Sequence, residues 1–187
     1  MQKQRIEPPQ QEPITLEEVK SHLRIINDEE DDYIKSLITT ARQDCEKFQN
    51  RAYYTQKWKL ALDKLQNGII TIPRPPCQSI DRIVLVNNEG TEHEVTDYET
   101  DLISEPARLK IEDYPSVNLQ EMSGLQIEYT AGYETVDDIP DNVKHAIKLL
   151  IGEWYAMREN AIATGAVPQE IPDGVKRLLS KDRVMPV

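Results

Sequence analysis

Glycine and cysteine are both scarce in this chain, and their scarcity excludes several kinds of site. The seven glycines are dispersed between Gly68 and Gly174, so they do not form the glycine-rich loop with which nucleotide-binding proteins cradle phosphate groups. The two cysteines, Cys45 and Cys77, form no CxxC pair, which favours free thiols in a reducing compartment over a disulfide framework. We therefore expect neither a known nucleotide-binding motif nor a cysteine-based metal site.

Long hydrophobic runs and excess positive charge are also missing. No apolar run approaches the ~20 residues that a membrane-spanning helix needs, and residues 1–13 contain no apolar core of the signal-peptide type. We therefore expect a soluble protein that is not exported and has no membrane partner. The 22 Lys and Arg residues face 33 Asp and Glu residues, which gives a formal net charge of -11. This sign disfavours tight, sequence-independent binding to nucleic acid.

Motifs for catalysis and metal binding are absent from the sequence as well. Its three histidines stand apart, without a GxSxG or HExxH pattern. The acidic run 28–32 does not match a calcium loop, because Tyr33 occupies the position that requires glycine. We interpret this run as the first turn of a helix, where the helix dipole favours negative charge. The sequence predicts no catalytic residue, no metal site and no cofactor.

Helical periodicity is present towards both ends of the chain. Thr15 and Glu18 have the spacing of a capping box, which predicts a short first helix ending near residue 25. Apolar residues then recur at intervals of three and four, which predicts a second helix over about 28–48 and a third over about 141–158. A last helical segment of about two turns follows Pro172.

The middle of the chain contains short β-branched and alternating segments that are typical of strands. These segments are Trp58–Leu62, Ile69–Ile72, Ile80–Val86, Leu109–Ile111 and Leu125–Tyr129. Residues 87–90 tolerate positive φ and predict a turn into residues 92–95. The pattern therefore predicts a small antiparallel sheet. Residues 73–76, PRPP, are expected to connect two strands rigidly, with a polyproline ligand as the alternative.

The order and spacing of these segments carry a family resemblance. The segments read ITLEEVKSHLRI, DDYIKSLITTARQDCEKFQNRA, TQKWKLALD, ITIPRPPCQSIDRI, LQIEYTAGYETVDDIPDNVKHAIKLLIGEWYAMREN and IPDGVKRLL. This succession resembles the head-tail connector, or adaptor, proteins of tailed bacteriophages and prophages over about residues 14 to 180. The RPP, YTAGY and EWYAMRE elements contribute most of its specificity.

The resemblance implies a fold class and a division of the chain. Compact adaptors of this family are nearly all helical, so we expect an α+β protein with a mainly helical adaptor core of about four helices and an inserted small antiparallel β-sheet subdomain. We expect a flexible N-terminal arm at 1–13, the helical core at 14–54 and 133–170, the β subdomain at 55–132 and a C-terminal docking segment at 171–187.

The resemblance also implies a function. Family members form a ring, here expected to hold twelve copies, which joins the portal protein of the DNA-filled head to the stopper or tail-completion protein. Such a protein is a non-enzymatic part of the virion neck that assembles in the host cytoplasm. DNA would pass through the lumen without specific binding, because twelve copies carry about -130 formal charges and repel DNA. The alternatives are a regulatory protein-binding module and a hydrolase that uses an acidic pair.

The C-terminal segment differs from the rest of the chain in its charge. Residues 171–187 contain four basic and two acidic side chains, and their helix is too short to be stable alone. In family members this segment is associated with the portal, whereas the alternative is that it packs within its own chain. The expected portal-binding residues are Val175, Lys176, Arg177, Leu178, Leu179, Lys181 and Arg183. Tyr155 and Arg158 are expected at the subunit interface, because aromatic and arginine side chains often anchor interfaces.

Overall fold

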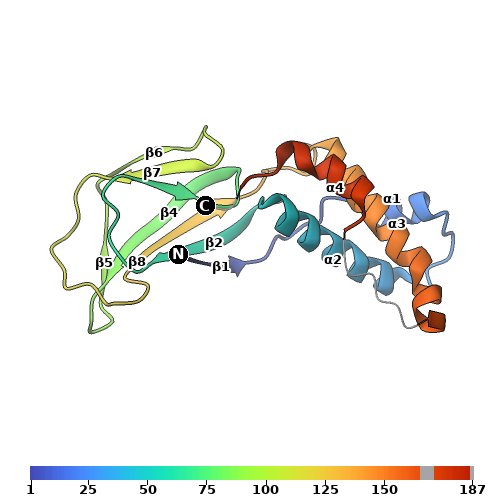
Figure 1. Cartoon of the computed structure of the whole chain (residues 1–187), viewed down its shortest axis with the longest axis horizontal. Helices are drawn as coiled ribbons and strands as arrows, with labels where there is room; N and C mark the ends of the chain where they lie inside the picture. The colour runs from blue at the N-terminus through green and yellow to red at the C-terminus, as the bar shows by residue number, and fades with distance from the viewer. Residues whose placement is uncertain (165–170, 186–187) are drawn as a thin grey trace. The chain divides into compact units, whose positions relative to one another are not determined.

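A computed structural model describes residues 1–164 and 171–185, with the side chains of the third helix described up to Met157. The described elements are β1 (Gln2–Glu7), α1 (Leu16–Leu23), α2 (Asp31–Gln49), β2 (Gln56–Leu62), β3 (Ile69–Ile72), β4 (Cys77–Val86), β5 (Glu92–Glu94), β6 (Tyr98–Asp101), β7 (Ala107–Ile111), β8 (Leu125–Ala131), α3 (Asp141–Thr164), α4 (Asp173–Leu179) and the 3-10 turn η1 (Ser180–Asp182). They form a β unit, residues 1–10 and 54–134, and a helical unit, residues 11–53 and 135–185 (Figure 1).

Two antiparallel sheets make up the β unit. The larger has the strand order β1-β2-β8-β4-β5, and the smaller has the order β3-β7-β6. The central strands β2 and β8 pair without a break from Gln56↔Ala131 to Leu62↔Leu125. Every second side chain of β8 is buried, as expected for a strand with one face towards a core. The fully buried core of this unit includes Leu60, Ile72, Ile83, Leu85, Leu109, Leu125, Ile127 and Tyr129.

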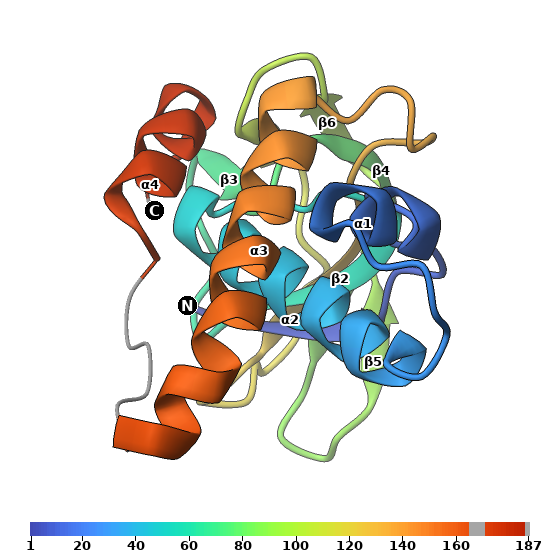
Figure 2. The same cartoon turned by 90° about the vertical axis from the view of Figure 1, so that its right-hand side faces the viewer.

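Four helices make up the described part of the helical unit. The apolar stripe of α2 is buried, as its periodicity predicts. Helix α3 packs against α2, and its own Val143, Ile147 and Leu150 are buried. Figure 2 shows α3 lying across α2, with α1 and α4 on opposite sides of it. The capping box at the start of α1 is confirmed, because Thr15 accepts from the Glu18 N–H and Glu18 accepts from the Thr15 N–H.

The expected mainly helical core is wrong. Strands are about as abundant as helix, with eight strands and four α-helices within the described residues, and they form two sheets, not one. The sequence pattern missed β1 and β6 because both are mainly polar and neither contains a buried residue. They become strands by pairing along the sheet edges, β1 with β2 and β6 with β7. Residues 2–7 are thus part of a sheet, where a flexible arm was expected.

The second helix begins later than the acidic run suggested. Only Asp31 and Asp32 lie in its first turn, so placing the whole run 28–32 there was wrong. Asp28 instead accepts from Lys20 of α1 at 2.5 Å, and Asp31 accepts from the same ammonium group at 2.7 Å. These two contacts connect α1 to the start of α2. The third helix extends further than expected, to Thr164.

The PRPP segment connects β3 to β4. Pro73 and Pro75 are buried, and the guanidinium group of Arg74 lies 5.2 Å from the ring centroid of Trp58. Because buried prolines cannot be presented to an aromatic groove on another protein, this geometry supports the strand connector over the polyproline ligand.

Gly132 explains why the YTAGY element needs glycine at its fourth position. Its φ is +110°, and a Cβ added there would lie 2.2 Å from the carbonyl oxygen of Tyr54. The Gly132 N–H also donates to the Pro76 carbonyl at 2.8 Å. Only a residue without a side chain lets the end of β8 approach the backbone before β2 this closely.

We predict opposite effects for two glycine-to-alanine substitutions. Gly132→Ala should lower the free energy of unfolding by about 1–3 kcal/mol, since alanine is strained at this φ and collides with Tyr54. Gly174→Ala, in α4, should be neutral or stabilise by up to about 1 kcal/mol, because open space surrounds it and alanine favours helix. Urea denaturation of both variants checks this, and equal effects would contradict it.

Candidate functional site

The described C-terminal segment, residues 171–185, packs within its own chain. Its helix α4 buries Val175 and Leu179, which are 2% and 0% exposed, against α3 and α2. The guanidinium group of Arg183 lies 4.7 Å from the ring centroid of Phe48 in α2. One side of the segment is therefore anchored to the helical unit.

Side chains of the helical unit donate to the backbone of this segment. The hydrogen bonds run from Gln49 Nε2 to the Leu179 carbonyl at 2.7 Å, from Arg51 Nε to the Asp182 carbonyl at 2.6 Å and from Asn142 Nδ2 to the Leu178 carbonyl at 3.1 Å. The last carbonyl groups of a helix have no partner within the helix. Gln49 and Asn142 satisfy such groups at the end of α4, and Arg51 holds the 3-10 turn that follows it.

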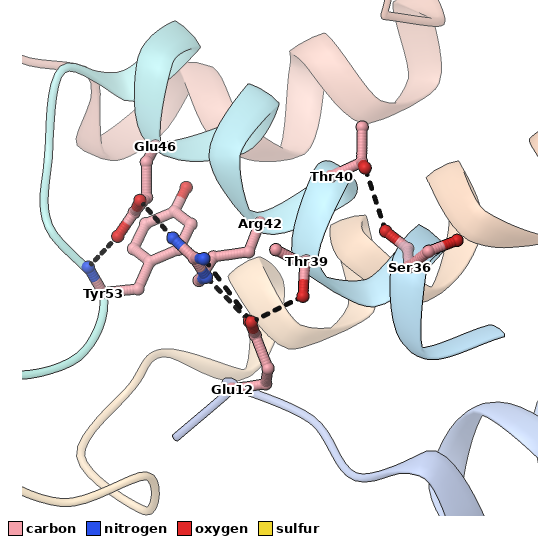
Figure 3. A network of polar contacts seen from close by, with 7 residues as sticks. All are labelled: Glu12, Ser36, Thr39, Thr40, Arg42, Glu46 and Tyr53. Carbon is pink, nitrogen blue, oxygen red and sulfur yellow. Dashed lines mark hydrogen bonds and ion pairs between the residues drawn. The ribbon is translucent and has the colours of Figure 1, made fainter. Parts of the chain in front are cut away.

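Figure 3 shows a polar network that joins Glu12, Arg42, Glu46 and Tyr53, and Tyr53 in turn contacts Gln49. Arg42, with a side chain 3% exposed, forms ion pairs with Glu46 at 2.9 Å and with Glu12 at 2.7 Å. Glu46 also accepts from the backbone N–H of Tyr53 at 2.9 Å. The Tyr53 hydroxyl donates to Gln49 Oε1 at 2.6 Å. The network thus extends from the N-terminal side of the unit to the C-terminal segment.

Opposite charges make the burial of Arg42 tolerable. Burial by itself would lower the pKa of Arg42, but the hydrogen bond that Arg42 donates to Glu12 and the negative charges of Glu46 and Glu12 outweigh it and raise that pKa. The guanidinium group therefore stays charged and uses its fork of donors on two carboxylates.

The seven residues expected to bind the portal divide into two faces of the segment. Val175 and Leu179 point into the helical unit, and Lys176 and Leu178 are half-buried. Lys176 lies 3.6 Å from the carboxylate of Asp173. The exposed members of the set are Arg177, Lys181 and Arg183. The geometry thus separates anchoring side chains from side chains that a partner can reach.

Tyr155 lies beside the loop that joins α1 to α2. Its hydroxyl donates to the carboxylate of Glu30, and its ring centroid is 6.4 Å from that of Tyr33. Together with residues 24–27 it lines a shallow hollow, next to which Ile26 is 96% exposed. Arg158 belongs to α3, but its side chain lies outside the described residues.

Sequence reasoning missed the polar residues that hold the segment. Gln49, Arg51 and Asn142 carry no local signal, because their partners lie 36 to 131 residues away. Arg42 and Glu46 did carry one, since a charged i, i+4 pair interrupts the apolar side of α2 around Cys45.

The described residues contain neither a metal-site cluster nor a helix suited to cross a membrane. Among them, no group of three or more His, Cys, Asp or Glu side chains has the arrangement of a metal site. No helix in the described part of the chain combines the length and apolarity needed to cross a membrane.

Comparison with known proteins identifies the family. The chain matches the family of phage gp6-like head-tail connector proteins over residues 13–114 and 101–183. It belongs to this family. The resemblance to head-tail connectors that the sequence carries is thereby confirmed. No curated protein sequence matches the chain.

Three solved structures are similar to the connector over 100% of its chain and 97% of theirs. They are the neck of an empty gene transfer agent (GTA) particle computed with C6 symmetry, at 21% identity and a TM-score of 0.80, the virion of a native GTA particle, at 21% and 0.78, and the neck of a native GTA particle computed with C12 symmetry, at 19% and 0.71. The shared fold includes the β unit, which is therefore not peculiar to this connector.

We predict that breaking the buried ion pair destabilises the connector strongly. Arg42→Met should lower the free energy of unfolding by about 3–5 kcal/mol, because it leaves the buried carboxylate of Glu46 without its cation. Lys35→Met, which breaks the exposed pair with Asp32, should change it by less than about 0.5 kcal/mol. Urea denaturation measures both.

A double variant gives the matching control. Arg42→Met with Glu46→Gln should recover part of the loss, since the amide still accepts from Tyr53 and carries no charge. A double variant as unstable as the sum of its single variants would contradict the role of the unpaired charge.

We also predict that both thiols of the folded connector resist alkylation at pH 8. Burial and nearby negative charge raise the pKa of Cys45 to about 12 and that of Cys77 to about 11, so both remain protonated well above neutral pH. Mass spectrometry after iodoacetamide treatment should find both modified in urea and neither under native conditions. Rapid native labelling of either thiol would refute this.

Proposed function

We propose that this connector assembles into a closed ring of identical subunits in the virion neck, between the portal protein and the stopper or tail-completion protein. It acts by binding, without catalysis, and joins its neighbours after synthesis in the host cytoplasm. Membership of the connector family carries this proposal. The likeness over the whole chain to neck proteins, in particles computed with C6 and C12 symmetry, supports a ring of twelve copies.

The C-terminal segment is the proposed portal contact, with its two faces in different roles. Val175 and Leu179 anchor α4 to the subunit, while Arg177, Lys181 and Arg183 are presented to the portal. Lys176 and Leu178 lie between these faces and complete the contact. Exposed basic side chains on an acidic subunit give the segment a charge that a complementary acidic surface would attract.

The proposed subunit contact includes Tyr155 and Arg158. A half-buried aromatic ring beside the highly exposed Ile26 supports this, since aromatic side chains anchor interfaces and Ile26 gains from losing its contact with water.

The proposed ring conducts DNA without holding it. Each subunit carries a formal net charge of -11, so a lumen with this balance repels the phosphate backbone and lets DNA slide. A lumen wall that is neutral or basic in an assembled ring would contradict this part of the proposal.

We predict that reversing exposed charge on the segment prevents attachment to the portal. Arg177→Glu with Lys181→Glu should leave circular dichroism and thermal stability unchanged, because both side chains are exposed. Supplied from a plasmid to an induced prophage that lacks the gene, this variant should give heads separated from tails in electron micrographs.

A matched charge change serves as the control. Lys35→Glu with Lys47→Glu alters two exposed lysines of α2 by the same total charge and should give joined particles. Joined particles with the segment variant would reject the portal contact, and normal particles without any copy of the gene would reject the connector function. Deleting residues 171–187 is a poorer test, because it uncovers the apolar surface beneath Val175 and Leu179.

A further inference from the structure

The turn between β6 and β7 presents an isoleucine to solvent. Ile103 is 96% exposed, although burying such a side chain is favourable. The exposure does not come from a loosely held loop, because Asp101 holds the turn from within. Its Oδ1 accepts from the N–H groups of Ile103 and Ser104 at 3.2 and 3.1 Å, and its Oδ2 accepts from Ser104 Oγ at 2.7 Å.

The arginine across the strand pair completes this turn. Arg108 Nε donates to Asp101 Oδ2 at 3.0 Å, and Asp101 and Arg108 are also paired residues of β6 and β7. The hydrogen bonds from Ser104 and Arg108 hold the pKa of the Asp101 carboxyl well below its usual range. The turn is thus built to hold Ile103 in one outward position.

A hollow lies elsewhere on the same unit. Met1, Leu62, Ile69 and Ile70 line it together with the polar residues Asp63, Lys64, Gln66 and Thr71. Ile69 is 60% exposed and Met1 is 52% exposed, so apolar surface is open to solvent there.

Strand register places the turn and the hollow at opposite ends of the smaller sheet. Ile69 pairs with Lys110 at one end of β7, and Ile72 pairs with Ala107 at the other. The turn that carries Ile103 joins β6 to β7 beside Ala107, because Asp101 pairs with Arg108. Ile69 and Ile103 therefore lie at different ends of the sheet.

We propose that Ile103 of one copy inserts into the hollow lined by Met1, Leu62, Ile69 and Ile70 of the next copy. This inference rests on the proposed ring. A closed ring requires two different surfaces on each subunit that fit each other head to tail. A rigid apolar projection and a hollow with the exposed apolar side chains of Met1 and Ile69, at opposite ends of one sheet, meet this requirement, whereas a contact between two identical turns does not.

Cysteine cross-linking between two full-length variants tests the contact. A chain with Ile103→Cys is mixed with a chain with Ile69→Cys at a concentration at which the wild-type chain forms rings, followed by mild oxidation. We expect a disulfide between the two variants and its loss after reduction. The native thiols of either chain do not compete for this disulfide, because both are buried and a disulfide needs Cα atoms within about 7 Å of each other.

Glu89→Cys, in the exposed turn after β4, replaces Ile103→Cys as the control and should give no disulfide with Ile69→Cys. Without cross-linking, Ile103→Ser should raise the protein concentration needed for self-association ~10-fold or more, the effect of withholding one isoleucine from burial, while Glu89→Ser leaves that concentration unchanged.

The outcomes separate this contact from the ring itself. Suppose that wild-type rings form. If the Ile103→Cys and Ile69→Cys chains then give no disulfide with each other, or if disulfides join only two Ile103→Cys chains, the proposed contact is overturned. The proposed ring is not affected by either result. A wild-type chain that stays monomeric at the highest concentration it tolerates would overturn both. A disulfide that forms equally well between Glu89→Cys and Ile69→Cys would also reject the contact, because it would come from random collisions between chains.

Discussion

The buried ion pair of Arg42 and Glu46 is the interaction on which the helical unit depends. A charge inside a protein is tolerated only with partners in place, so Arg42 holds both Glu46 in its own helix and Glu12 from the N-terminal segment. Glu46 in turn holds the backbone of Tyr53. Glu12 and Tyr53 stand near two of the three points at which the described chain passes between the units, 10/11 and 53/54. One guanidinium group therefore fixes these two passages on the helical side.

The same network connects the interior of the helical unit to the C-terminal segment, residues 171–185. Tyr53 orients Gln49, and Gln49 donates to the carbonyl at the end of α4. A helix of only seven residues is unstable by itself in water, so α4 exists because the unit supplies apolar contacts and hydrogen-bond donors for it. Its anchored side faces the subunit, and its basic side faces solvent. That separation suits the proposed portal contact, because the subunit holds one side of the segment and leaves the other side open to a partner.

The β unit belongs to the fold that the connector shares with the GTA neck structures. Polar strands lie at the edges of its sheets, and exposed apolar side chains such as Ile69 and Ile103 lie at the ends of the smaller sheet. β1 occupies an edge of the larger sheet with almost no apolar burial, and β6 occupies an edge of the smaller one. Charged side chains along such edges limit unwanted strand pairing. Side chains at the ends of a sheet suit a specific contact between copies better than its edge strands do. They expose apolar groups without also exposing unpaired backbone N–H and C=O groups.

The sequence by itself determined the features that depend on neighbours along the chain. The capping box of Thr15 and Glu18, the buried stripe of α2 and the turn at 87–90 all follow from local spacing, because backbone geometry repeats every 3.6 or every two residues. The order and spacing of its segments were also sufficient to identify the family. Only the tertiary structure decided that β1 and β6 are strands, that Lys20 pulls Asp28 away from α2, and that Val175 and Leu179 face inward. Each of these depends on partners distant in sequence, whose attraction leaves no periodic trace in the segment itself.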